Sequence, residues 1–175
     1  YETDAFKLAL EYARRILLKD KLETKLKQEA KIMIARSSLK IEDFYTAEKY
    51  YTDLEKNASG KLKAEALYHL SLFKNRQKEY IQSNEIVQNL IANYSSHKYW
   101  AVKSYVIMGK NYYGLEDVYQ ATFVLENIMK NFKQFENIVK EAETELKLIK
   151  HKEAKTNNSV SLEMNETEQK KDLKK

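Results

Sequence analysis

The pattern of apolar and polar positions along this chain follows a helical period and repeats itself. Two neighbouring stretches each show an amphipathic helix, a short polar turn and a second amphipathic helix: LKAEALYHLSLFKNRQKEYIQSNEIVQNLIANY and AVKSYVIMGKNYYGLEDVYQATFVLENIMKNF. Apolar residues that recur at three- and four-residue intervals favour α-helix over strand. The chain has three glycines and no proline, so signals for strands and tight turns are few. The sequence therefore predicts an all-α protein.

Aligning the two stretches shows that they are copies of one unit. Ser71 aligns with Gly109 and Ser83 with Ala121, each pair 38 residues apart. Similar residues extend this alignment toward the N-terminus. Three columns run through four copies: Phe6, Phe44, Tyr80 and Val118; Ala9, Ala47, Ser83 and Ala121; and Ile16, Leu54, Leu90 and Ile128. An internal repeat of this length is typical of proteins built from stacked structural units.

Packing explains why small residues recur at fixed positions. Two antiparallel helices approach closely only where one presents a small side chain and the other inserts a large one. One helix pair cannot bury its whole apolar face, so neighbouring pairs must stack. The sequence predicts a right-handed α-α superhelix, a solenoid of antiparallel helix pairs with a C-terminal capping helix. The predicted units span residues 1–21, 22–60, 62–96 and 99–133, followed by a capping helix at 134–151 and a disordered charged tail at 152–175.

Local signals mark several boundaries within these units. Residues 41–43 form a predicted turn, and Asp43 is the expected N-cap of the helix that follows. Gly60 supplies the permissive backbone expected where that helix ends. Trp100 is expected to open the next helix and to pack across the boundary between two units.

These residues resemble the tetratricopeptide repeat family. The resemblance covers residues 4–150 and implies a helical solenoid that binds other proteins, with the first helix of each pair lining a concave groove. Two departures stand out: the chain lacks the proline that closes the family's second helix, and its periods of 36 and 38 residues exceed the usual 34. The matching residues are Leu67, Leu70, Ser71, Tyr80, Ser83 and Leu90 in one copy, then Gly109, Tyr112, Ala121 and Ile128 in the next.

The resemblance also suggests where such a chain occurs. Long-period members with helices rich in Tyr, Asn and Lys look most like bacterial cell-envelope proteins, so the periplasm or cell envelope is the expected location. The first predicted helix, at residues 4–19, aligns with the second helix of a unit. We therefore expect the chain to be a C-terminal fragment of a longer repeat protein.

Composition and motifs argue against catalysis within these residues. There is no cysteine, and His69, His97 and His151 are not spaced as metal ligands. Neither a GxxxxGK[ST] loop nor a GxGxxG loop occurs, so no phosphate cradle is expected. We predict no enzyme activity, no metal and no cofactor.

Charge and hydropathy limit the possible partners. The 31 basic and 26 acidic residues are mixed along the chain and give a net charge of +5. Such a mixture favours solubility over nucleic-acid binding. No apolar run reaches the length of a membrane span, so membrane insertion of this segment is not expected.

The family's groove-facing pattern, carried onto this sequence, selects aromatic side chains and cations from three first helices. Tyrosine and arginine suit protein interfaces because each offers a large contact area with hydrogen-bonding ends. The cations are suited to an acidic peptide or a carboxylate terminus. The lysine/asparagine carboxylate clamp of the family's co-chaperone members is absent. The predicted partner-binding residues are Arg36, Tyr68, Leu72, Asn75, Arg76, Lys103, Lys110 and Tyr113.

The predicted function is a non-catalytic protein–protein interaction scaffold that presents its concave groove to a protein or peptide within a larger assembly. One alternative is a docking or regulatory domain of an enzyme encoded upstream. A more distant alternative is an RNA-binding helical repeat, which needs a basic residue at one fixed position per unit. At such a position this chain has Glu29, Glu65 and Lys103.

Overall fold

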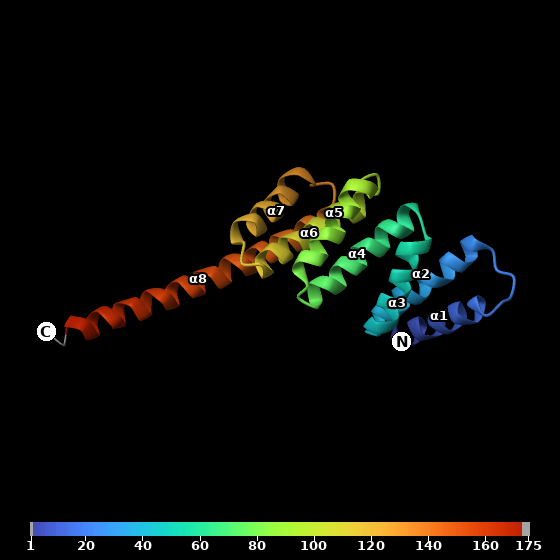
Figure 1. Ribbon diagram of the computed structural model, residues 1–175, viewed down its shortest axis with the longest axis horizontal. Coiled ribbons are helices and arrows are strands. Elements are labelled where there is room, and N and C mark those ends of the chain that lie inside the picture. Colours follow the sequence, from blue (N-terminus) through green and yellow to red (C-terminus); the bar gives the residue numbers. More distant parts are fainter. Residues whose placement is uncertain (1, 173–175) are drawn as a thin grey trace.

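The computed structural model describes the backbone of residues 2–172 and the side chains of residues 3–156. Within the described backbone the chain forms eight helices and no strand, arranged as an elongated stack from which the last helix projects (Figure 1). The helices are α1 (Glu2–Leu17), α2 (Thr24–Lys40), α3 (Phe44–Asn57), α4 (Gly60–Arg76), α5 (Tyr80–Tyr94), α6 (Lys98–Gly114), α7 (Val118–Asn131) and α8 (Glu136–Asp172). This confirms the predicted fold class, an all-α solenoid.

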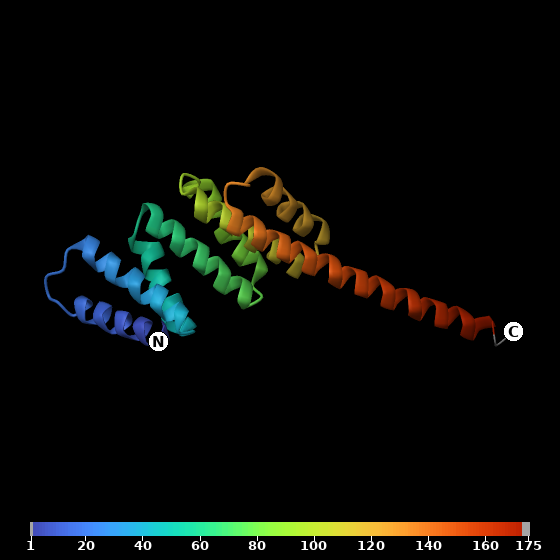
Figure 2. The ribbon, with the colours of Figure 1, turned by 180° about the vertical axis from the view of Figure 1, so that it is seen from behind.

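The helices lie in two layers that differ in how closely they pack. Each helix contacts the next one in the chain, so α2–α3, α4–α5 and α6–α7 form antiparallel pairs. The first helices of successive pairs also contact each other, α4 against α6 and α6 against α8. Seen from behind, the first part of α8 crosses the last pair (Figure 2). The second helices of these pairs have no comparable contacts among the described residues, so we take the first-helix layer as the inner, concave side of the stack.

The three helix pairs share one turn geometry. Each first helix has 17 residues and ends in a turn whose central residue is left-handed without being glycine. The following N–H donates to the carbonyl five residues earlier, which is the Schellman arrangement of helix ends. The left-handed residues are Glu42, Lys78 and Glu116, with φ of 62°, 62° and 64°; the hydrogen bonds run from Asp43 to Ser38, from Glu79 to Lys74 and from Asp117 to Tyr112, each 2.9 Å.

The variation in repeat length comes from the linkers between pairs and from the second helices, since α3 has 14 residues and α5 has 15, whereas the turns are equal in length. The linkers comprise residues 58–59, 95–97 and 132–135, and lengthen along the chain. The predicted cap of α3 is confirmed, because the Asp43 carboxylate accepts a hydrogen bond from Thr46 N at 3.0 Å. The role predicted for Gly60 was wrong. Gly60 has a left-handed φ of 57°, but it begins α4, whereas α3 already ends at Asn57.

The columns of the repeat lie where the helices meet. In the last three copies the small residues Ala47, Ser83 and Ala121 are fully buried, as are the apolar residues of the third column. Gly109 permits a close approach, because a Cβ there would lie 2.9 Å from the buried Leu125 side chain. The repeat pattern therefore records close packing between helices.

Replacing Ala121 by leucine is expected to lower the free energy of unfolding by about 1–3 kcal/mol, because the added atoms have no space between α6 and α7. Urea unfolding followed by circular dichroism measures this change. The matched control is Ala92→Leu on the exposed face of α5, which should stay within about 0.5 kcal/mol of the parent chain. Equal stability of the two variants would contradict close packing at Ala121.

The last helix differs from its predicted bounds. The capping helix was predicted to end at residue 151 and to be followed by disorder, but α8 is continuous to Asp172. The chain has no proline and its last glycine is Gly114, so no residue interrupts the helix. The beginning of α8 provides the expected cap, since Ile138, Ala142 and Ile149 are buried against the last pair. The tail residues 173–175 lie outside the described residues.

Candidate partner-binding groove

The eight residues predicted to bind a partner differ in their surroundings and fall into five groups. Arg76 and Lys103 point away from the protein interior and lie against aromatic rings. The Arg76 guanidinium lies 4.5 Å from the centre of the Phe44 ring, while the Lys103 ammonium lies 5.1 Å from that of Tyr68. Among the described residues, neither cation forms an ion pair. These two retain free positive charge in the groove.

Arg36, in contrast, is held by a buried acid. Its Nε lies 2.7 Å from Glu65 Oε1 and its Nη2 lies 2.6 Å from Oε2, so the pair is bidentate. The Glu65 side chain is 2% exposed and the Arg36 side chain 53%. The hydrogen bond to Glu65 raises the pKa of Arg36 above its ordinary value. Arg36 therefore compensates the charge of Glu65 and joins α2 to α4.

Tyr68 and Leu72 belong to the packed floor of the groove. Tyr68 is 5% exposed, and its ring lies 5.0 Å from that of His69 and 5.3 Å from that of Trp100. Burial raises the pKa of Tyr68. Leu72 is half-buried against the same cluster. Trp100 opens α6 and packs across the boundary between units, as predicted.

Asn75 takes part in a polar network between α4, α5 and α6. Its amide donates to Asn111 Oδ1 at 2.7 Å, and the Asn111 amide donates to Ser83 Oγ and Asn84 Oδ1, both at 2.8 Å. Ser83 Oγ then donates to the Ser71 carbonyl. Sequence reasoning missed Asn111, although a fully buried asparagine on the apolar face of a helix needs several partners.

Helix α8 fills the end of the groove where Lys110 and Tyr113 lie. Lys110 Nζ is 2.9 Å from Glu145 and 3.8 Å from Glu141, while the Tyr113 hydroxyl donates to Glu153 at 3.1 Å. Partial burial and the hydrogen bond to Glu153 raise the pKa of Tyr113. These two residues therefore fasten the capping helix.

His69 was given no functional role by the sequence, yet it lies at the centre of the floor. Its ring stacks on that of Tyr51 at 4.4 Å and lies 5.8 Å from that of Trp100. Burial, and to a smaller extent the charges of Lys103, Arg36 and Arg76, lower the pKa of His69 to about 3. The imidazole is consequently neutral at physiological pH.

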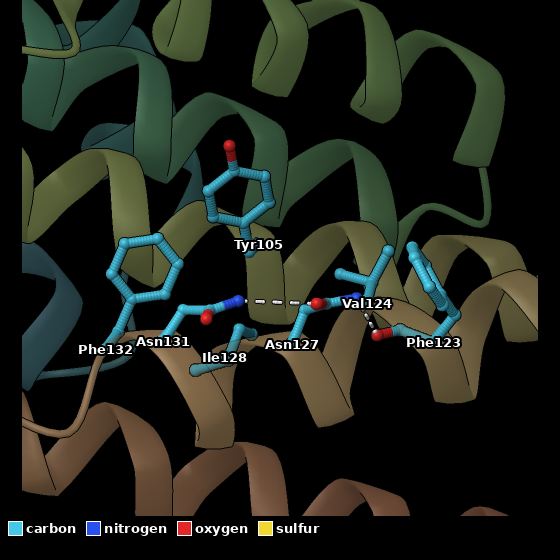
Figure 3. Close-up of a pocket in the computed structure, with 7 residues that line it drawn as sticks. All are labelled: Tyr105, Phe123, Val124, Asn127, Ile128, Asn131 and Phe132. Atoms are coloured by element: carbon cyan, nitrogen blue, oxygen red, sulfur yellow. Dashed lines mark hydrogen bonds between the residues drawn. The ribbon is translucent and has the colours of Figure 1, made fainter.

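A second hollow lies on α7, outside the first-helix layer. It has a volume of about 320 Å³, and Figure 3 shows Phe123 of α7 and Phe132 of the following linker at the two ends of a row of side chains, with Tyr105 of α6 opposite them. The Asn127 amide is used within α7, where it donates to the Phe123 carbonyl at 2.8 Å. None of the predicted groove residues lines this largely apolar pocket.

Within the described residues, no helix has both the length and the apolar character needed to cross a membrane, and no cluster of three or more His, Cys, Asp or Glu side chains suits a metal ion. No protein-family profile matches the chain, and a comparison with characterised proteins finds no significant match.

Proposed function

We propose that this chain is a non-catalytic scaffold of the tetratricopeptide type that holds a segment of a protein partner in its concave groove. The support is architectural: buried small residues bring repeated helix pairs together, and the first helices of the pairs form the inner layer. A rigid layer of parallel helices presents side chains in a fixed order without any chemical step. We propose a bacterial periplasm or cell envelope as the location, because the repeats resemble those of long-period cell-envelope members.

The observation that carries the proposal is the free charge of Arg76 and Lys103. Both lie on the concave side beside aromatic rings, and neither has a carboxylate partner among the described residues. The opposite end of the groove is closed by the contacts of Lys110 with α8. A partner therefore binds along α4 and the first half of α6, where cations and rings together suit an extended acidic segment.

The test is affinity capture from the source cell with three forms of the full chain. The parent chain should retain a protein that the Arg76→Glu/Lys103→Glu variant releases. The control, Lys130→Glu/Lys133→Glu, makes the same change in net charge on exposed residues of α7 and its following linker. Circular dichroism verifies that all three fold. Equal capture by both variants would overturn binding through the groove.

Recovery of RNA in place of a protein would favour the alternative function instead. In that case the retained material would be sensitive to ribonuclease and would be lost with rising salt.

A further inference from the structure

A cavity of about 330 Å³ lies at the edge of the groove where α4 and α6 begin. The two helix starts are in contact there, since a Cβ on Gly60 would lie 3.7 Å from His97 Nε2. No acidic side chain lines the cavity. Its lining residues are Arg36, Lys61, His97, Lys98, Tyr99 and Trp100.

The free charge of this cavity comes from two lysines. Arg36 is already compensated by Glu65. Lys61 and Lys98 are exposed, and within the described part of the chain neither is paired with a carboxylate. Both line the cavity, each from the first turn of a different helix. The cavity therefore has two ammonium groups for an anionic ligand.

The N-terminal ends of α4 and α6 also favour an anionic ligand in this cavity. The residues before α4 and α6 are Ser59 and His97, and neither side chain accepts a hydrogen bond from the helix that follows. Neither first turn contains an acidic residue. Unsatisfied N–H groups and the positive end of the helix dipole attract negative charge at such positions.

The cavity continues into the groove already described. The rings of Tyr99 and Trp100 form part of its wall, and Lys103, one turn further along α6, lies 5.7 Å from the centre of the Tyr99 ring. The unpaired cations thus extend from the cavity at the helix starts along α6. Further along α6, Glu141 and Glu145 of α8 lie beside Lys110, and such carboxylates disfavour a long nucleic-acid backbone.

We propose that this cavity anchors carboxylate side chains of an acidic segment in the protein partner, with Lys61 and Lys98 as their ligands. The inference rests on the proposed scaffold function and assigns the chemistry of the partner. The segment enters at the starts of α4 and α6 and runs along α6 past Lys103. The rings of Tyr99 and Trp100 pack against the aliphatic parts of the acidic side chains, while the lysine ammonium groups bind the carboxylates.

Trp100 gives a direct readout, because it lines the cavity and is the only tryptophan of the chain. The full chain is titrated with an oligoglutamate peptide and, in parallel, with an oligoglutamine peptide of equal length. Oligoglutamate should change the Trp100 fluorescence saturably, and added salt should weaken binding. Lys61→Glu/Lys98→Glu should raise the Kd at least about tenfold, whereas Lys130→Glu/Lys133→Glu should change it less than about twofold.

Three results would overturn the proposal: equal binding of oligoglutamine, equal weakening by both double variants, or no saturable change with oligoglutamate. Inorganic phosphate, oligoadenylate RNA and vesicles containing phosphatidylserine are run as separate arms. Tighter binding of any of these through Lys61 and Lys98 would assign the cavity to that ligand instead. If oligoglutamate does not bind but Arg76→Glu/Lys103→Glu still abolishes protein capture, only the proposed acidic anchor is wrong. If that variant captures the same protein as the parent chain, the proposed scaffold function is wrong as well.

Discussion

Acidification from pH 7 to pH 4 is expected to cost the folded chain about 3 kcal/mol of unfolding free energy through His69. Burial lowers the pKa of His69 from 6.5 to about 3. In the unfolded chain the imidazole takes up a proton near pH 6.5, whereas in the folded chain it stays neutral until about pH 3. Its stabilising contribution is therefore complete above pH 6.5 and falls by about 1.4 kcal/mol for each pH unit below that value.

Urea unfolding at a series of pH values measures this slope, and a variant isolates the residue responsible. His69→Phe keeps an aromatic ring beside Tyr51 and removes the titrating group, so its stability should depend less on pH. His151→Gln, at an exposed position, should keep the slope of the parent chain. Identical slopes for His69→Phe and the parent chain would show that His69 is not held neutral by the fold.

Replacing Arg36 by alanine is expected to lower the free energy of unfolding by about 3 kcal/mol. The side chain of Glu65 is 2% exposed, so removing its bidentate partner leaves a carboxylate buried without compensation. Replacing both charged residues should lower the free energy of unfolding much less, because apolar side chains can fill the same space without leaving a buried, unpaired charge. Arg36→Met/Glu65→Met should therefore recover most of the loss.

Thermal and urea unfolding of these variants provide the measurement. Arg76→Ala is the matched control, since Arg76 is an exposed arginine that lies over the Phe44 ring and, among the described residues, has no carboxylate partner. Its effect should remain below about 1 kcal/mol. A loss for Arg36→Ala as small as that for Arg76→Ala would mean that the pair with Glu65 contributes little to the fold.

Helices and their mutual contacts could be predicted from the sequence because both follow a local period. The spacing of apolar residues predicted the helix pairs. The recurring small residues predicted the close helix contacts at Ala47 and Ala121, which are fully buried. The Asp43 cap depended on residues within one turn of it. The continuation of α8 was missed because a polar composition was taken to mean disorder, although nothing in the chain interrupts the helix there.

The groove was harder to predict, because which of its side chains remain unpaired depends on partners that are distant in the sequence. Arg36 meets Glu65 from 29 residues away and Tyr113 meets Glu153 from 40. A repeat pattern identifies the face on which such residues lie but not the pairs that form across units. Lys61 and Lys98 were missed because the family's groove pattern selects positions inside helices, whereas these two lie at helix starts.

The common turn of the three hairpins has a consequence for how such a chain can be rebuilt. Each hairpin carries its own left-handed residue and its own closing hydrogen bonds, so the geometry of its turn depends on no neighbour. The linkers at residues 58–59, 95–97 and 132–135 then govern how each hairpin docks on the next. A hairpin can thus be exchanged only together with its partners across the unit boundary, such as Arg36 with Glu65 and Asn75 with Asn111, while its turn can be transferred unchanged.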